Sequence, residues 1–218
     1  MKKFFKNYSL SFVFLILFFI SLLGQTYTGF HEYNKERNEE NQPAVSLNQY
    51  FSSGHFLQST FENWESEFLQ MALFVCFTIF LYQKGSSESK KFDGTDEVDK
   101  EPNPNKKDAP WPVKKGGFML KLYQHSLTIV LLALFVVSFC AHFYGSLKDE
   151  NEQRFIQGLG KLSTTDYLGD SRFWFESFQN WQSEFLSVFA IIVLSIFLRQ
   201  KGSSQSKPVD APHYQTGE

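Results

Sequence analysis

The chain has 218 residues, a formal net charge of −2 at pH 7 and 43% hydrophobic residues, with 26 Phe among them. Its apolar residues gather into four dense blocks between strongly polar segments, which is why the mean hydropathy stays at −0.25. This composition excludes a disordered chain, a disulfide-built secreted module and a basic nucleic-acid-binding protein, so no nucleic-acid partner is expected.

The first apolar block, residues 10–23, follows three lysines and therefore starts like a secretory signal peptide. No small-x-small cleavage site comes after it, because the next residues are Gly-Gln-Thr-Tyr. A corresponding block occurs inside the chain, at 127–144, where a signal peptide cannot lie. We therefore expect the first block to be a retained membrane anchor.

Each of the four apolar blocks has a core of 13 to 15 residues. Such a core covers only about 20 Å of a hydrocarbon layer about 30 Å thick. Aromatic residues flank the blocks, as interfacial belts require, and lengthen each one to a membrane span. We therefore predict an all-α membrane protein with four transmembrane helices, at about 8–27, 63–83, 124–144 and 180–199.

The chain repeats itself at an offset of 117 residues. Without a gap, residues 4–90 align with 121–207, and about 30 of 87 positions are identical. The longest shared words are Phe-x-Asn-Trp-x-Ser-Glu-Phe-Leu, at 61–69 and 178–186, and Gln-Lys-Gly-Ser-Ser-x-Ser-Lys, at 83–90 and 200–207. This identity indicates a tandem duplication of a two-helix unit. Because each copy is expected to cross twice, the copies share one orientation, with a pseudo-twofold axis along the membrane normal.

Lysine and arginine set the expected orientation. The N-terminus, the linker between the copies and the C-terminal tail carry fifteen of them, against six in the two other loops. Because such residues collect on the cytoplasmic side, we expect the termini and the linker to be cytoplasmic. The expected organisation is membrane repeat 1 at 1–90 with an external loop at 28–60, a flexible linker at 91–120, membrane repeat 2 at 121–207 with an external loop at 145–177, and a tail at 208–218.

The duplicated tryptophan word is the strongest candidate for a functional site. On a helix its Asn and Glu fall at i and i+4 beside the Ser, away from an aromatic face. A carboxylate at this place lies near the outer edge of the hydrocarbon, where it usually faces protein, a partner or water. The candidate polar site residues are Asn63, Ser66, Glu67, Asn180, Ser183 and Glu184, and the candidate interfacial anchors are Trp64, Trp181 and Trp111.

Two interpretations of Glu67 and Glu184 are open. The first places them among the lipid headgroups, where an acidic side chain favours the positive N-terminal part of a helix. The second makes them a proton or cation site around the pseudo-twofold axis, with one carboxyl group protonated because like charges repel. Glu62 and Glu65 are replaced by Gln in the second copy and are weaker candidates.

No residue pattern indicates catalysis, a cofactor or a metal. The five histidines do not cluster in the sequence, and no zinc-protease, Cys-x-x-Cys or Ser-His-Asp pattern occurs. Cys76 and Cys140 each lie inside an apolar block, where we expect them to pack rather than to form a disulfide. The Gln-Lys-Gly-Ser-Ser word is expected to end each second helix at the inner membrane surface.

Several longer words give the chain a resemblance to a known family. They are Ser-Gly-His-Phe-Leu at 53–57, Glu-Asn-Trp-Glu-Ser-Glu-Phe-Leu-Gln-Met at 62–71, Asp-Ala-Pro-Trp-Pro-Val at 108–113 and Phe-Trp-Phe-Glu-Ser-Phe-Gln-Asn-Trp-Gln-Ser-Glu-Phe-Leu at 173–186. In this order they resemble an uncharacterised bacterial membrane-protein family, classed as a domain of unknown function, over nearly the whole chain. The resemblance implies a multi-pass protein of the bacterial inner (plasma) membrane and supplies no activity, ligand or functional residue.

These observations favour a non-enzymatic envelope protein, meaning a structural, assembly or stress-related factor. Its expected partners are the lipid bilayer and either a second copy of the chain or another envelope protein. Two long polar external loops and the lack of a catalytic pattern support this hypothesis. The alternative is a small oligomeric channel or transporter that uses Glu67 and Glu184 as a proton or cation site. Four short helices enclose little volume, so an aqueous pathway would need oligomerisation.

Overall fold

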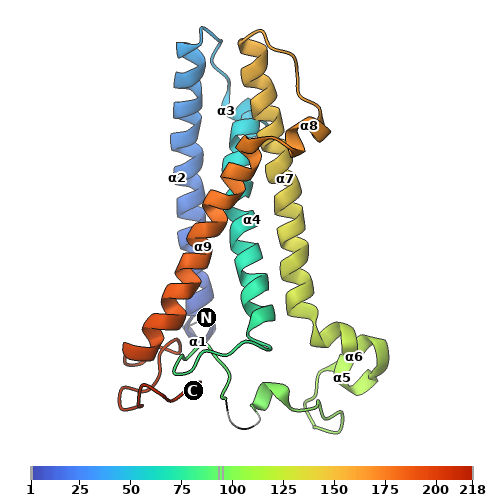
Figure 1. Cartoon of the computed structure of the whole chain (residues 1–218), viewed down its shortest axis with the longest axis vertical. Coiled ribbons are helices and arrows are strands. Elements are labelled where there is room, and N and C mark those ends of the chain that lie inside the picture. The colour runs from blue at the N-terminus through green and yellow to red at the C-terminus, as the bar shows by residue number, and fades with distance from the viewer. Residues whose placement is uncertain (1, 93, 95, 218) are drawn as a thin grey trace. The chain divides into compact units, whose positions relative to one another are not determined.

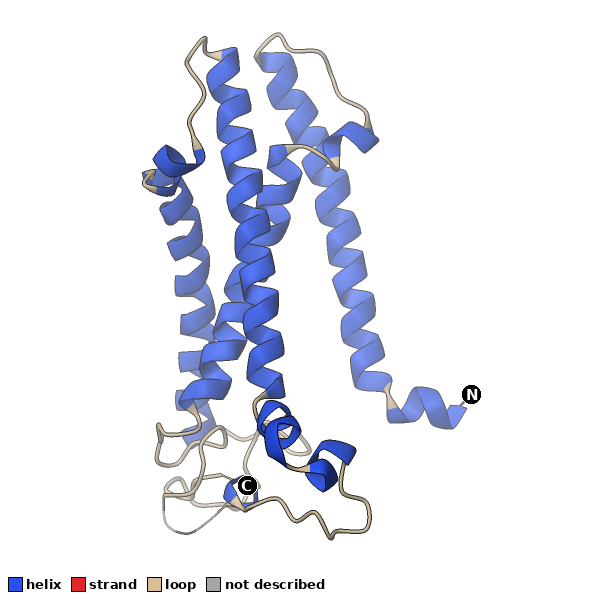
Figure 2. Cartoon of the chain, turned by 90° about the vertical axis from the view of Figure 1, so that its right-hand side faces the viewer, coloured by secondary structure: helices blue, strands red, loops and turns tan. Residues whose placement is uncertain are grey.

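The computed structural model describes residues 2–92, 94 and 96–217, and these residues form helices and no strands (Figures 1 and 2). Four of the described helices have more than twenty residues, and the remaining elements are short. The elements in chain order are α1 (Lys2–Asn7), α2 (Ser9–Glu39), α3 (Leu47–Tyr50), α4 (Gly54–Phe77), the 3₁₀ helix η1 (Glu97–Asp99), α5 (Trp111–Lys115), α6 (Gly117–Gln124), α7 (Ser126–Ile156), α8 (Thr164–Leu168) and α9 (Ser171–Phe197).

The chain forms two compact units. Unit 1 comprises Met1–Thr60 and Ala141–Phe173, and unit 2 comprises Phe61–Cys140 and Trp174–Glu218. The helices α4, α7 and α9 contribute residues to both units. Each unit is described below by its own contacts.

Three helices, α2, α7 and α9, are long and apolar enough to cross a membrane. The expectation of four transmembrane helices is therefore wrong for the segment at 63–83. Every eighteen-residue stretch of α4 contains Glu62, Glu65 and Glu67, whereas α9 has Gln at the first two of the corresponding positions. A charged side chain at the centre of a bilayer costs about 2.5–3.5 kcal/mol. Three carboxylates therefore make it unfavourable for α4 to cross a membrane by itself.

The C-terminal end of α4 also differs from the sequence expectation. The helix stops at Phe77, and the amides of Ile79 and Leu81 bond the carbonyls of Cys76 and Phe77 in a tightened turn. The corresponding helix of the second copy, α9, continues three residues further in the alignment. The apolar part of α4 is thus about ten residues, or about 15 Å, which is half of a hydrocarbon layer.

In unit 1, α2 and α7 extend well beyond their apolar blocks. Each has 31 residues, so each is about 46 Å long and exceeds the hydrocarbon thickness. The expected external loops at 28–60 and 145–177 therefore begin as helix. Their polar ends carry an identical clamp: Asn34 exchanges two hydrogen bonds with the backbone of Val45 at 2.7 and 3.2 Å, and Asn151 does the same with Leu162.

Other hydrogen bonds in unit 1 recur at the same offset of 117 residues. The guanidinium Nε of Arg37 donates to the carbonyl of Pro43, and that of Arg154 donates to the carbonyl of Gly160. Helices α3 and α8 are each capped by a serine that accepts from the backbone amide three residues later. Side chains that are identical in the two copies therefore fix two loops in one conformation.

Two glycines let α4 and α7 approach at backbone distance in unit 1. A Cβ atom added to Gly145 would lie 2.5 Å from the amide nitrogen of Gln58, and one added to Gly54 would lie 2.7 Å from the Gly145 carbonyl oxygen. Beside this crossing, Arg172 donates to Asp149 at 2.6 Å and to Gln58 at 3.2 Å. Small residues of this kind permit close helix packing in membrane proteins.

In unit 2, the C-terminal tail folds onto the loop that follows α4. The ammonium group of Lys207 is buried and donates to the carbonyls of Gly85, His213 and Gln215 at 2.5, 3.0 and 2.9 Å. Burial, and to a smaller extent the charge of Arg199, lowers the pKa of Lys207. The ends of α4 and α9 therefore lie on the same side of unit 2.

We predict that Gly145→Ala destabilises the protein by about 1–3 kcal/mol, because the new methyl group meets the backbone of α4. Gly24→Ala in α2 is the matched control, since nothing lies within 4 Å of its added Cβ. There the better helix propensity of Ala stabilises by up to about 1 kcal/mol. Thermal unfolding in detergent micelles measures both variants, and equal effects would contradict the close crossing.

Candidate functional site

The two tryptophan words come together in unit 2, one on α4 and one on α9. The indole nitrogen of Trp181 donates to a carboxylate oxygen of Glu65 at 2.8 Å. The Glu65 side chain is fully buried, so the indole satisfies an acceptor that would otherwise lack water. We call Glu65, Glu67, Trp181 and Glu184 the tryptophan–carboxylate cluster.

Glu67 and Glu184 lie close enough in this cluster for their side chains to interact electrostatically. Glu67 is exposed and Glu184 is half-buried, so the pair lies at an accessible edge of unit 2. The pair can hold a shared proton or a weakly bound cation. Two carboxylates alone do not fill the six to eight oxygen positions that Ca²⁺ prefers.

The other predicted polar residues mainly bond their own helices. The hydroxyl of Ser66 donates to the carbonyl of Asn63 at 2.8 Å, and Ser183 donates to the carbonyl of Asn180 at 2.9 Å. The Asn180 amide also donates to the carbonyl of Glu176 at 3.0 Å. Serine hydroxyls commonly bond a carbonyl one turn back, so these contacts position backbone rather than a ligand.

The three predicted tryptophan anchors lie in different surroundings. Trp64 packs edge-on against Phe61 at 5.1 Å, and Trp181 packs in the same way against Phe178 at 5.4 Å. Trp181 is also the donor to the buried carboxylate described above. Trp111 is 62% exposed, on the short helix α5.

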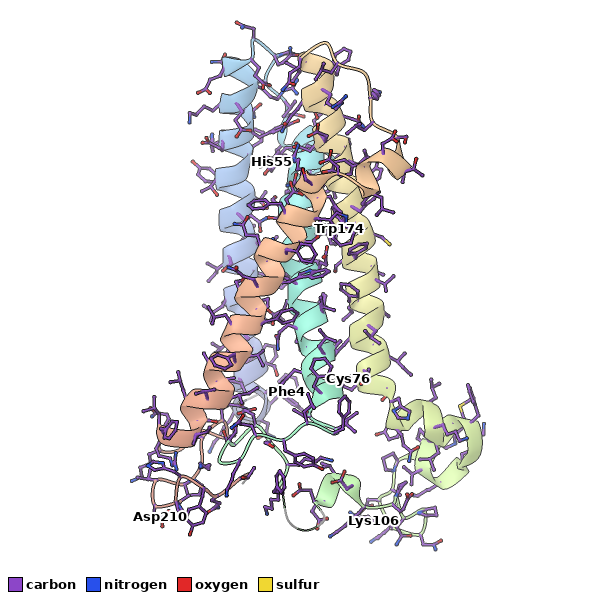
Figure 3. All side chains as sticks on the ribbon, in the orientation of Figure 1. Phe4, His55, Cys76, Lys106, Trp174 and Asp210 are labelled. Carbon is purple, nitrogen blue, oxygen red and sulfur yellow. The ribbon has the colours of Figure 1, made fainter. Side chains whose placement is uncertain are left out.

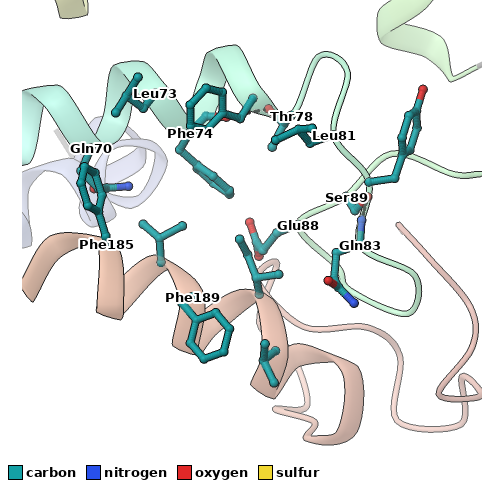
Figure 4. A pocket seen from close by; sticks show the side chains of 15 residues that line it. Gln70, Leu73, Phe74, Thr78, Leu81, Gln83, Glu88, Ser89, Phe185 and Phe189 are labelled. Carbon is teal, nitrogen blue, oxygen red and sulfur yellow. Dashed lines mark hydrogen bonds between the residues drawn. The ribbon is translucent and has the colours of Figure 1, made fainter. Parts of the chain in front are cut away.

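An apolar cavity of about 450 Å³ opens between α4 and α9 in unit 2, one turn beyond the carboxyl pair (Figure 4). Gln70 and Phe185 lie at its near end, and Phe74 and Phe189 line its walls. The loop after α4 contributes Glu88, whose side chain points into the space between the two helices (Figure 4). Its volume lies within the range of small-molecule sites, which are mostly apolar with a few polar groups.

Sequence reasoning missed Glu65 and this cavity. The comparison of the two copies makes Glu65 a weak candidate, because the second copy has Gln182 at its position, whereas in the structure Glu65 is the buried partner of Trp181. One available signal was its position next to the tryptophan in an otherwise duplicated word. The cavity depends on how two helices pack and has no local sequence pattern.

Within the described residues the chain is helical, and three of its helices are long and apolar enough to cross a membrane, which is typical of a membrane protein. The chain belongs to the family described as domain of unknown function DUF6766, whose model matches residues 1–218. No curated protein and no solved structure matches the chain.

We predict that Trp181→Phe destabilises the protein by about 1–3 kcal/mol, because it leaves the buried Glu65 carboxylate without its indole donor. Glu65→Gln keeps an acceptor for the indole and is expected to cost less. Trp111→Phe, at an exposed site, is the control and is expected to change stability by less than about 0.5 kcal/mol. Thermal unfolding in micelles ranks the three variants, and equal stability of Trp181→Phe and Trp111→Phe would contradict the role of the bond.

Proposed function

We propose that the chain is a multi-pass protein of the bacterial inner membrane that acts as a non-enzymatic structural, assembly or stress-related factor. It works through a protein partner, either an envelope protein or a second copy, and through lipids. One observation carries this proposal: in unit 1 both polar loops are fixed by paired asparagine clamps. A preformed surface loses less conformational entropy when a partner binds.

The proposal includes a tandem duplication. It is supported by the Asn34 and Asn151 clamps, which hold equivalent backbone groups 117 residues apart. The loops that follow α4 and α9 give independent support, since Gln83 bonds Ser89 as Gln200 bonds Ser206. Side chains that make these bonds are kept, while most of the apolar positions differ between the copies.

We also propose that the N-terminus, the linker and the tail face the cytoplasm, as the excess of Lys and Arg favours. In unit 2, Ser86 hydrogen-bonds Ser195, and the Gly85 amide donates to Thr216. These bonds support a common side for the linker and the tail. α4 then returns the chain to that side as a helix that depends on α9, not as an independent span.

The fixed loops expose apolar residues where a partner can bind. Leu47 of α3 and Leu168 of α8 are 45% and 49% exposed beside their capped helices. A photoreactive amino acid at Leu168 is expected to form a discrete protein adduct in the native membrane. The same photoreactive amino acid placed at Val98, which is 81% exposed on the linker, is the control for non-specific adducts.

We predict that Asn151→Ala lowers the yield of the Leu168 adduct several-fold, because it removes two hydrogen bonds that fix the loop before α8. Each such bond contributes about 1 kcal/mol. Gln157→Ala, at an exposed position of the same loop, is expected to leave the yield unchanged. An adduct that forms equally at Val98, or that ignores Asn151→Ala, would argue against a specific partner surface.

A second candidate function is a small oligomeric channel or transporter. The observation that favours it is the proximity of Glu67 and Glu184, two carboxyl groups that interact electrostatically, with an apolar cavity one turn away. A carboxyl pair that shares one proton can exchange it or accept a cation in its place. Oligomerisation would supply the walls of an aqueous path.

For this second candidate, we predict that proton or cation flux into proteoliposomes disappears in the Glu67→Gln/Glu184→Gln double variant. Glu97→Gln, at the exposed η1, is the control and keeps full flux. Both variants are compared at equal incorporation and equal unfolding temperature. Absence of flux in the wild type, over a range of pH, ions and voltage, would remove the transporter candidate and leave the partner-binding proposal.

A further inference from the structure

The linker of unit 2 is divided by charge. Its first part, residues 88–101, has six acidic residues and three lysines. Its second part, residues 106–124, has five lysines and one aspartate. The excess of positive charge therefore lies in the sequence immediately before α7. Figure 3 labels Lys106, the first lysine of this second part. The five lysines are Lys106, Lys107, Lys114, Lys115 and Lys121.

Lysines of the two parts are bonded differently. In the acidic part, Lys90 pairs with Asp99 at 2.9 Å, and Lys100 pairs with Glu97. In the basic part, Lys114 donates to a backbone carbonyl, and Lys115 lies 4.8 Å from the centre of the Trp111 ring. Within residues 2–92, 94 and 96–217, none of the five lysines pairs with a carboxylate. Their charge is therefore available to an external anion.

The same segment exposes large apolar side chains. Trp111 on α5 and Phe118 on α6 are 62% and 72% exposed, and Leu122 and Tyr123 are also exposed. The two short helices contact each other and are joined through Gly116, whose φ of 68° suits glycine. Aromatic and basic residues on short amphipathic helices are typical of segments that lie in a membrane interface.

The position of the segment supplies the reason for this composition. α6 ends at Gln124 and α7 begins at Ser126, so only His125 separates them (Figure 1). If α7 crosses the membrane from its first turns, α6 ends at the membrane surface. Four to eight basic residues directly beside such a helix are typical of a site for anionic lipids.

We propose that residues 106–123 form a docking surface for anionic phospholipid headgroups, with Trp111 and Phe118 inserted at the acyl boundary. The five lysines neutralise the headgroup charge, and the acidic part of the linker stays in water. The surface thereby sets the depth at which α7 begins. This inference rests on the proposed membrane placement of α7.

The test is hydrogen exchange of the full chain in nanodiscs, with neutral phosphatidylcholine alone or with added phosphatidylglycerol. We predict that anionic lipid slows amide exchange in 111–124 at least tenfold, because each lysine near an anionic surface changes binding about fivefold. Lys114→Gln/Lys115→Gln/Lys121→Gln removes this slowing. Lys90→Gln/Lys91→Gln/Lys100→Gln, in the acidic part, is the matched control and keeps it. High salt is expected to reduce the slowing.

Amide hydrogen exchange in residues 127–139 of α7 distinguishes a failure of the proposed lipid surface from a failure of the proposed membrane placement of α7. If these amides are protected in both lipids while 111–124 exchanges equally in both, α7 crosses and the lipid surface is wrong. If they exchange freely, the membrane placement of α7 and the lipid surface are both wrong. Slowing that follows the number of chains per disc, and not the lipid charge, would assign the segment to a second copy and overturn the proposal.

Discussion

The backbone crossing of α4 and α7 in unit 1 is the constraint on which most of that unit depends. Gly54 and Gly145 leave no space for a side chain, so the two helices meet through their main chains. Beside this crossing, Arg172 donates to both Asp149 and Gln58. The polar ends of the helices are therefore held by contacts that a single methyl group would disturb.

Much of the helical architecture could be predicted from the sequence, but the number of spans could not be read from apolar blocks alone. The block after Phe68 has the length of its counterpart in α9, and its difference lies in the residues before it. Glu62 and Glu65 stand where α9 has Gln, and they lie within any window long enough to cross. The extension of α2 to Glu39 depends on helix propensity of polar residues, which hydropathy does not report.

The candidate site shows a similar division. Comparison of the copies pointed to Glu67 and Glu184 as a site, which stays a prediction, although the two carboxyl groups lie close enough to interact in unit 2. The same comparison led away from Glu65, because it gives less weight to a position at which the two copies have different residues. The contact uses one indole, that of Trp181, and one acceptor, the carboxylate of Glu65, so the acceptor has to occur in only one of the two copies. A sequence difference between the copies can therefore mark the contact itself.

The dependence of α4 on α9 has a consequence for how the chain is made. α4 leaves the ribosome about 117 residues before the helix that supplies the indole for Glu65 and the partner for Glu67. During that interval the buried Glu65 carboxylate lacks its indole donor. This contact is therefore completed only after the second half of the chain has been synthesised.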